Sequence, residues 1–335
     1  MTEGGFATAA GEFRPPAWLG NPHVQSIFPS LPFRRPGVER RCAPLLRASV
    51  EEILDCGDGV RLLSHHATQE RLGREPARRL VVLLHGWEGS ANSSYMLSLV
   101  LALHKAGYAA FRLNLRDHGG TQGLNVELFH SCRIAEVVNA IAAVRALFVP
   151  RRLALVGYSL GGNFALRVGA RSASAGVALD GIVAICPVLH PPHTMAALET
   201  GFWAYRRYYL RKWRRSLLAK AACFPSRYAV GDLRRFKTLT ETTDFFVREY
   251  TELTDLESYL HGYSILGSGL NGLSVPSRII ASADDPIIPS EDLAALPRNP
   301  SLAVTLLPWG GHCGFVTDYR LRSCVDAMVV AELAR

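Results

Sequence analysis

The 335-residue sequence lacks most features that would assign it to a specialised class of protein. It has no low-complexity tract and no run near the ~20 apolar residues of a membrane-spanning helix. Its first stretch, MTEGGFATAAGEF, has neither the basic start nor the apolar core of a signal peptide. We therefore expect a globular, cytoplasmic protein, and a 48% hydrophobic composition is enough for a large core.

Cysteine is present but follows no pattern of a disulfide framework or a zinc site. The cysteines are odd in number, scattered, and never spaced as CxxC. His190 and His193 are separated by two prolines and have no third ligand nearby in sequence. The sequence thus predicts reduced thiols, no metal and no other cofactor. The seven cysteines are Cys42, Cys56, Cys132, Cys186, Cys223, Cys313 and Cys324.

Acidic residues are missing from one strongly basic segment. Between Arg206 and Lys220 there are seven bases and no acid, and subtracting these seven from the net charge of +8 leaves the rest of the chain at +1. Basicity confined to one segment argues against a protein that binds nucleic acid.

Short apolar runs alternate with helix-period segments from Leu80 onward. Runs of Val, Ile and Leu without polar alternation are typical of strands buried on both faces, and the helices between them supply parallel crossovers. An antiparallel hairpin is predicted around Gly57-Asp58-Gly59. The strand rhythm stops from about 190 to 275, where the sequence is aromatic, basic and helical, and then resumes with SRIIASADD, the helix-like SEDLAALP and LAVTLL.

This pattern predicts an α/β fold with a mostly parallel central sheet flanked by helices. We expect one domain over residues 1–335, with an N-terminal arm at 1–47 and a helical cap inserted at about 190–275.

A serine between glycines follows the apolar run at 153–155. The stretch GYSLG at 157–161 matches the G-x-S-x-G nucleophile elbow, in which serine occupies a strained turn between a strand and a helix. Glycines two residues to either side omit the Cβ atoms that would clash in this close packing. Ser159 is therefore the candidate nucleophile, beside the positive end of the following helix.

A serine hydroxyl is a poor nucleophile and needs a base and an acid that orients the base. In triads of this fold the order is Ser, acid, His, each after a strand. His312 follows LAVTLL, and Asp284 and Asp285 follow RIIA. Asp285 is preferred as the acid because Ile-Ile-Pro at 287–289 comes after it, which leaves Asp284 as a turn or capping residue. Each residue alone has a structural interpretation, but three in the right order favour catalysis.

Acyl transfer also needs N–H donors for the developing oxyanion. The loop LLHGWEGSANSSY follows the first parallel strand, where the N–H of Trp87 is placed to pair with that of Leu160. His85 is interpreted as a structural histidine of this loop. The GxGxxG match at 267–272 lacks a surrounding βαβ unit, so it is interpreted as a loop that returns from the cap.

Several stretches together resemble the YheT-like branch of the α/β-hydrolases over about 300 residues. They are PAWLGNPHVQSIFP, HGWEGSANSSYM, NLRDHGGTQGLNVELFHSC, GYSLGGN, DFFVREYTELTDLESYLHGYS, ADDPIIP and GGHCGF. The resemblance implies a serine esterase whose relatives act on carboxylic esters, on phospholipid acyl chains or in acyl transfer to alcohols. It also implies Ser159 as nucleophile, Asp285 as acid and His312 as base.

One loop departs from many of those relatives. After the second parallel strand they have an Arg-Gly loop, where this sequence has Arg-Asp-His-Gly-Gly at 116–120. Asp117 and His118 are open to two interpretations, stabilisation of the turn or an effect on substrate preference.

The basic segment forms a two-faced helix from Phe202 onward. Two interpretations remain open. In the first, the aromatic face packs on the core and the basic face is solvated. In the second, the helix lies peripherally on the inner face of an anionic membrane. Phe202, Tyr205, Tyr209, Trp213 and Leu217 share one face, and Arg207, Arg211, Lys212, Arg214 and Arg215 lie mostly opposite.

From these patterns we expect a hydrolase of carboxylic esters that forms an acyl-enzyme on Ser159. Its substrate is a small-molecule or lipid acyl ester. The alternatives are an acyltransferase that uses an alcohol acceptor and a non-catalytic binding protein that retains the fold.

Overall fold

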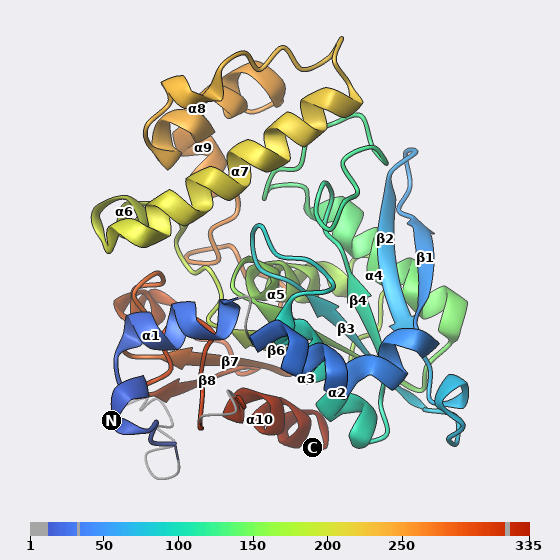
Figure 1. Ribbon diagram of the computed structural model, residues 1–335. Helices are drawn as coiled ribbons and strands as arrows, with labels where there is room; N and C mark the ends of the chain where they lie inside the picture. The colour runs from blue at the N-terminus through green and yellow to red at the C-terminus, as the bar shows by residue number, and fades with distance from the viewer. Residues whose placement is uncertain (1–12, 32–33, 319–321) are drawn as a thin grey trace.

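A computed structural model describes residues 13–31, 34–318 and 322–335. Eight strands form one sheet in the order β1-β2-β4-β3-β5-β6-β7-β8. β2 pairs antiparallel with β1 and β4, and the other neighbours are parallel, which confirms the predicted hairpin and sheet (Figure 1). The strands are β1 (Val50–Asp55), β2 (Arg61–Ala67), β3 (Arg79–Leu84), β4 (Ala109–Leu113), β5 (Arg152–Tyr158), β6 (Gly181–Ile185), β7 (Ser277–Ser282) and β8 (Leu302–Leu307).

Helices lie on both faces of the sheet and in the segment between β6 and β7. The α-helices are α1 (Pro22–Ile27), α2 (Arg34–Ala48), α3 (Ser94–Lys105), α4 (Ile134–Phe148), α5 (Leu160–Ser172), α6 (Pro191–Thr200), α7 (Trp203–Cys223), α8 (Leu239–Tyr250), α9 (Leu256–Gly262) and α10 (Cys324–Leu333). The 3₁₀ turns are η1 (Ala17–Leu19), η2 (Phe28–Ser30), η3 (Glu70–Leu72), η4 (Leu233–Arg235) and η5 (Ser290–Ala295).

Both faces of the sheet are buried, because successive side chains of a strand point to opposite sides. In β3, Leu80, Val82 and Leu84 pack with α4 and α5, whereas Val81 and Leu83 pack with α3 and α10. All six strands from β3 to β8 run parallel, so their carboxyl ends meet along one edge. Loops that leave this edge carry the candidate site residues.

The segment between β6 and β7 forms α6 to α9 and lies where the cap was predicted; we call residues 191–275 the cap (Figure 1). The GxGxxG stretch at 267–272 lies in the cap's return to β7, as a series of turns. SEDLAALP forms the 3₁₀ turn η5 instead of the expected α-helix, because Pro289 and Pro297 bound it closely.

The N-terminal arm was predicted over 1–47, of which residues 1–12 and 32–33 lie outside the described part. The short helix α1 begins with Asn21, whose side chain accepts from the N–H groups of His23 and Val24. α2 packs against α3 at the side of the sheet. The arm therefore runs along the core, and α1 lies near the loop that follows β8.

Candidate active site

Ser159 lies in a sharp turn between β5 and α5. Its backbone has φ 53° and ψ −119°, a conformation that residues other than glycine rarely adopt. Its N–H donates to the carbonyl of Ile185 at 2.8 Å. A Cβ at Gly157 would clash with the carbonyl of Gly161, and one at Gly161 would clash with that of Leu84. Both glycines are thus required by close packing, and the turn has the geometry expected of a nucleophile elbow.

The structure brings the three predicted side chains into one hydrogen-bonded chain. His312 Nε2 lies 2.9 Å from Ser159 Oγ, and His312 Nδ1 lies 2.9 Å from Asp285 Oδ2. The residues come from the ends of β5, β7 and β8, which are neighbours through β6 in the sheet. An imidazole with a hydroxyl on one nitrogen and a carboxylate on the other is able to accept the hydroxyl proton.

The two neighbouring aspartates have different partners. Asp285 turns Oδ2 toward His312, and its Oδ1 accepts the N–H groups of Ile287 and Ile288 at 2.8 and 3.0 Å. Asp284 accepts the N–H of Gly311 at 2.9 Å. Asp284 therefore braces the loop that carries the histidine, while Asp285 contacts the histidine itself.

Sequence reasoning missed that α1 braces the same loop. The side-chain hydroxyl of Ser26 accepts the N–H of His312 at 2.7 Å. Gln25 is fully buried, accepts the N–H of Val316 at 2.8 Å and donates to the Val316 carbonyl at 3.2 Å. NPHVQS was noted only as a shared stretch, and nothing in its composition indicates contact with a loop nearly 300 residues away.

The two predicted oxyanion donors flank Ser159. A Cβ built on Gly86 would lie 3.3 Å from Ser159 Cβ, so the loop after β3 passes beside the nucleophile. The N–H of Gly86 is occupied by the hydroxyl of Tyr95 at 3.0 Å. The N–H groups of Trp87 and Leu160 have no acceptor in the described residues, and that of Leu160 is free because it opens α5.

His85 is a structural residue of that loop. It is fully buried, its Nδ1 donates to the carbonyl of Gly86 at 2.8 Å, and its Nε2 accepts the N–H of Leu115 at 3.1 Å. Burial lowers the pKa of His85 to about 3, so the imidazole is neutral and has no free nitrogen for catalysis.

Aromatic side chains of α7 cover the loop that carries Trp87. The Trp87 ring stacks on Tyr209 with centroids 5.2 Å apart and meets Trp213 edge-on at 5.5 Å. Tyr205, one turn earlier, is buried and its hydroxyl lies 3.0 Å from His23 Nδ1 of α1. The cap is thereby joined both to the loop after β3 and to the N-terminal arm.

The loop after β4 is held by a buried ion pair. Asp117 has a positive φ of 59°, and its Oδ1 lies 2.8 Å from Lys220 Nζ of α7. Its other oxygen accepts the N–H of Phe129 at 2.8 Å. His118 Nδ1 lies 2.7 Å from the carbonyl of Arg116. These contacts support turn stabilisation for both residues.

The packing of α7 differs from the prediction at the start of the helix, and a basic residue near its end is buried. Phe202 was placed on the packed face but is 39% exposed. Lys220 belongs to the basic segment yet is buried, because it pairs with Asp117. Tyr205 and Leu217 are buried as expected. The aromatic face is therefore packed inward, and membrane contact through the opposite face stays a prediction.

Charge around His312 favours its protonated form. Burial favours the neutral imidazole, but the negative charges of Asp285 and Cys313 outweigh it and raise the pKa of His312 well above its ordinary value. Burial also disfavours the Cys313 thiolate, yet a hydrogen bond from Cys186 and the charge of His312 lower the pKa of Cys313 to about 6.

Cys186, Cys313 and His312 place three potential metal-ligand atoms within 4.8 Å of one another. Both nitrogens of His312 already contact Ser159 and Asp285, so the group offers only two sulfur ligands, fewer than a zinc site uses. His193 Nδ1 lies 2.7 Å from Asp292 and His190 Nδ1 lies 3.2 Å from Ser264, so these two histidines have other partners.

The fold and this site define a member of a large enzyme class. The model of the alpha/beta hydrolase family matches residues 81–322, and the chain belongs to this family. The predicted fold class and the resemblance to the YheT-like branch are both confirmed.

Particular relatives include esterases and a phospholipase. YheT of Escherichia coli (strain K12), which carries the name of an esterase, is 27% identical over 326 residues that cover 94% of this chain and 90% of YheT. Phospholipase ABHD3 of Mus musculus is 22% identical over 74% of this chain, which spans only 61% of that phospholipase. The structure of the Pyrococcus furiosus esterase Pf2001 matches with a TM-score of 0.57 and 16% identity, over 86% of this chain and 90% of that one.

These likenesses support a hydrolase with esterase relatives. No helix within the described residues combines the length and apolar character needed to cross a membrane.

Proposed function

We propose that the protein is a serine hydrolase that cleaves carboxylic esters through an acyl-enzyme on Ser159. The observation that carries the proposal is the pair of 2.9 Å contacts that join Ser159, His312 and Asp285. Ser159 Oγ attacks the ester carbonyl carbon while its proton passes to His312 Nε2. Asp285 holds the proton on Nδ1 and stabilises the imidazolium that forms.

The remaining steps use the same residues. The N–H groups of Trp87 and Leu160 hold the negative oxygen of the tetrahedral intermediate. The imidazolium of His312 then gives its proton to the leaving alcohol, whose bond to the carbonyl carbon breaks. Water, deprotonated by His312, attacks the acyl-enzyme and releases the acid and free Ser159.

The surroundings support an apolar acyl ester as substrate. Trp87, Tyr209 and Trp213 form an aromatic layer above the oxyanion loop. Aromatic side chains offer large apolar areas, which suit contact with the hydrocarbon of an acyl chain. Small-molecule and lipid acyl esters both meet this requirement, and a phospholipase is among the relatives.

A fluorophosphonate probe tests the nucleophile directly, because it modifies only an activated serine. We expect labelling of the wild-type chain, none in Ser159→Ala and much slower labelling in His312→Ala. Equal labelling of wild type and Ser159→Ala would contradict the proposal. A folded wild-type chain that resists the probe would favour the non-catalytic alternative.

Chromogenic esters of increasing acyl length then define the substrate. Ser159→Ala is expected to lose about 10⁶-fold in kcat, as nucleophile removal does in serine hydrolases. Product analysis in water with added alcohol separates hydrolysis from transfer. Free acid as the main product supports hydrolysis, and a transesterified product as the main product would replace it by acyltransferase activity.

A further inference from the structure

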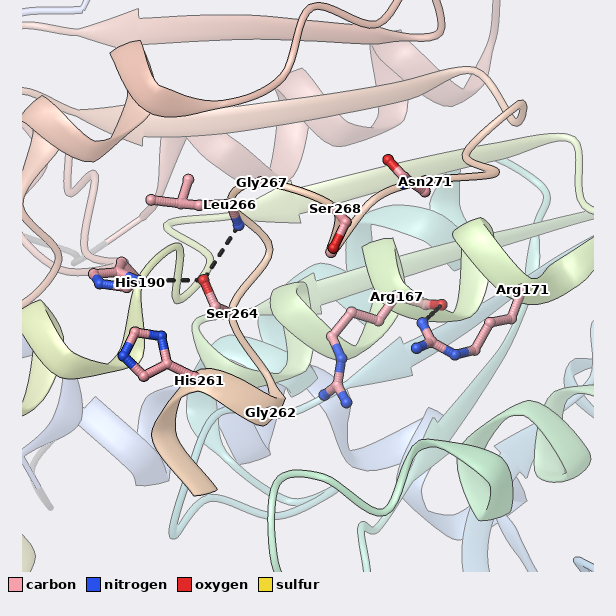
Figure 2. A pocket seen from close by; sticks show the side chains of 11 residues that line it. Arg167, Arg171, His190, His261, Gly262, Ser264, Leu266, Gly267, Ser268 and Asn271 are labelled. Atoms are coloured by element: carbon pink, nitrogen blue, oxygen red, sulfur yellow. Dashed lines mark hydrogen bonds between the residues drawn. The ribbon is translucent and has the colours of Figure 1, made fainter. Parts of the chain in front are cut away.

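A cavity of about 830 Å³ lies between α5 and the chain that returns from the cap to β7. Figure 2 shows two arginines of α5 on one side, the loop around Ser268 on the other, and two histidines at one end. No carboxylate is among its lining residues in the described structure. We call it the basic cavity, and its polar lining is Arg167, Arg171, His190, His261, Ser264, Ser268 and Asn271.

The charge of Arg167 is buried, and no acidic side chain among the described residues pairs with it. The residue is only 3% exposed, and its Nη1 donates to the carbonyl of Ser131 at 2.8 Å and to Asn163 Oδ1 at 3.3 Å. Its Nε and Nη2 have no acceptor among the described residues. Burial of an ion without a counter-charge is costly, because neutral acceptors replace only part of its hydration.

Arg171 adds a second positive charge one turn along the same helix. It is exposed and donates to the carbonyl of Arg167 at 3.1 Å. Like charges four residues apart destabilise a helix. Burial lowers the pKa of Arg167 to about 10, and the charge of Arg171 acts in the same direction. An anion between the two guanidinium groups would remove both penalties.

The basic cavity is separate from the catalytic residues. Arg167 lies eight residues beyond Ser159, which is about 12 Å along an α-helix. Between them, Asn163 donates to the carbonyls of Val188 and Tyr263 at 2.9 and 2.8 Å, so the end of α9 closes against α5 there. None of the lining residues belongs to the proposed triad or its oxyanion donors.

We propose that the basic cavity binds a phosphate group. Guanidinium forks donate pairs of hydrogen bonds to phosphate oxygens, and two such groups line this cavity. A phosphate group carries nearly two negative charges at neutral pH, which suits two guanidinium groups better than the single charge of a carboxylate. The bound group joins α5 of the core to the end of the cap, so it also stabilises the cap's attachment.

Calorimetric titration with inorganic phosphate tests the proposal. We expect saturable binding to the Ser159→Ala chain, and a Kd at least about 10-fold weaker when Arg171→Gln is added, because a charge-assisted hydrogen bond is lost. Arg145→Gln is the matched control, since Arg145 Nη1 likewise donates to a backbone carbonyl, that of Ala178 at 3.0 Å. Sodium chloride at equal ionic strength controls for screening.

Thermal unfolding gives a second readout, in which phosphate raises Tm of the control chain by a few degrees and leaves Arg171→Gln unchanged. No saturable binding, or equal affinity in Arg171→Gln and Arg145→Gln, overturns the proposal. Because every chain carries Ser159→Ala, these results do not depend on the proposed catalysis.

Vesicles distinguish a soluble phosphate compound from a lipid headgroup. If the ligand is a headgroup, vesicles of phosphatidylcholine with phosphatidic acid bind the control chain, pure phosphatidylcholine does not, and inorganic phosphate competes. If binding is seen with inorganic phosphate alone, the ligand is soluble. Vesicle binding that phosphate inhibits and binding of inorganic phosphate alone both support a phosphate site in the basic cavity. Vesicle binding that persists in Arg171→Gln and in the presence of phosphate argues against such a site.

Discussion

Asp284 and Asp285 are adjacent carboxylates, but only one reaches the imidazole. Asp285 Oδ2 contacts His312 Nδ1, and Asp284 Oδ1 contacts the N–H of Gly311. In Asp284→Asn, the amide oxygen still accepts the N–H of Gly311. In Asp285→Asn, the neutral amide has no charge to stabilise the imidazolium of His312. We therefore expect Asp285→Asn to lower kcat on a chromogenic ester by about 10³- to 10⁴-fold. Asp284→Asn is the matched control and is expected to stay within a few-fold of wild type; equal losses would reassign the acid.

The charge around His312 sets the acid limb of the pH profile. The proposed mechanism needs neutral His312, and the negative charges of Asp285 and Cys313 raise its pKa. Because protonation blocks proton transfer from Ser159, kcat/KM falls as the pH drops through this raised pKa. We expect a midpoint above the ordinary histidine value of about 6.5, measured as kcat/KM between pH 5 and pH 10.

Removal of the Cys313 thiolate by Cys313→Ser should move that midpoint to lower pH, because one negative charge beside His312 is lost. His193→Gln removes a histidine paired with Asp292 elsewhere and should leave the profile unchanged. A wild-type midpoint at or below 6.5 contradicts the electrostatic account.

Sequence pattern is informative for residues that directly follow strands. Ser159, Asp285 and His312 come after runs of buried β-branched and leucine residues, so their common edge was predictable. The proximity of Cys186 and Cys313 was not, because 127 residues separate them and both lie in loops with positive φ. Neither the residues around each cysteine nor their spacing along the chain indicates that the two thiols lie close together.

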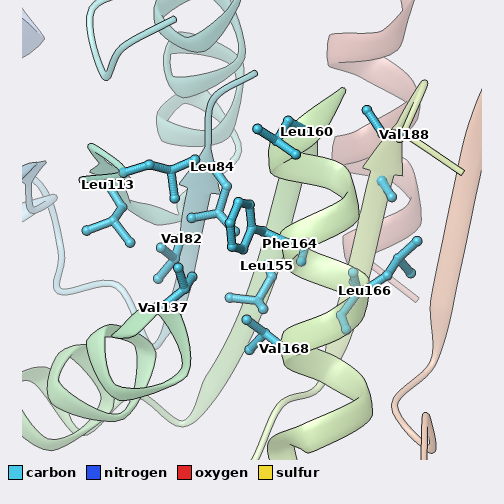
Figure 3. Packing of buried hydrophobic residues seen from close by; sticks show 14 of the residues in the cluster. Val82, Leu84, Leu113, Val137, Leu155, Leu160, Phe164, Leu166, Val168 and Val188 are labelled. Atoms are coloured by element: carbon cyan, nitrogen blue, oxygen red, sulfur yellow. The ribbon is translucent and has the colours of Figure 1, made fainter. Parts of the chain in front are cut away.

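At the scale of elements, the apolar periodicity identifies the strands and helices that form the core. Figure 3 shows Val82 and Leu155 of neighbouring strands packed with Phe164 and Val168 of α5. Such side chains recur every two residues in strands and every three or four in helices, which local sequence reveals. The role of α1 is invisible locally, because its polar residues bond to a loop that is distant in sequence.

α1 gives a test of positioning at this scale. Ser26 accepts the N–H of His312, so Ser26→Ala should loosen the catalytic loop and lower kcat several-fold, with a smaller change in KM. Ser174→Ala is a control, since within the described residues its hydroxyl bonds only to the Arg171 carbonyl, at the other end of α5. Labelling by the fluorophosphonate probe should slow in parallel with kcat.

Gln25→Met is the stronger variant at the same helix. It leaves the N–H and carbonyl of Val316 buried without partners, which costs about 1–3 kcal/mol for each group. Chemical denaturation should therefore show a loss of stability that Ser26→Ala shows to a lesser extent. Unchanged stability and kcat in both variants would mean that α1 does not brace the histidine loop.

At the scale of the whole molecule, the cap lies at the end opposite the C-terminal helix α10 (Figure 1). Its composition predicted helices and a two-faced α7, but its placement depends on contacts between distant residues. The Asp117–Lys220 ion pair and the stack of Trp87 on Tyr209 fix α7 over the sheet edge. Lys220 resembles its basic neighbours in sequence, so its burial was not predictable from charge.

The outer face of α7 combines exposed bases with exposed apolar side chains. Trp203 is 60% exposed and Leu218 is 51% exposed, and Arg207, Arg211 and Arg215 lie between them at helical spacing. Lys212 and Arg214 instead donate to the carbonyls of Glu88 and Phe236. A face of this composition is typical of a helix that rests on an anionic membrane surface. Contact there would hold the aromatic layer near the bilayer interface.

We therefore expect the protein to bind vesicles that contain phosphatidylglycerol, measured by co-sedimentation at low salt. Replacing Arg207, Arg211 and Arg215 by Gln should weaken binding by about 10²-fold, because each base near such a surface contributes about 1 kcal/mol. The control replaces three exposed arginines away from α7, namely Arg151, Arg152 and Arg298. If the two triple variants bind equally, the vesicle responds to the net charge of the protein and not to the position of the arginines. The exposed bases of α7 would then only be solvated, and the helix would not be a membrane contact.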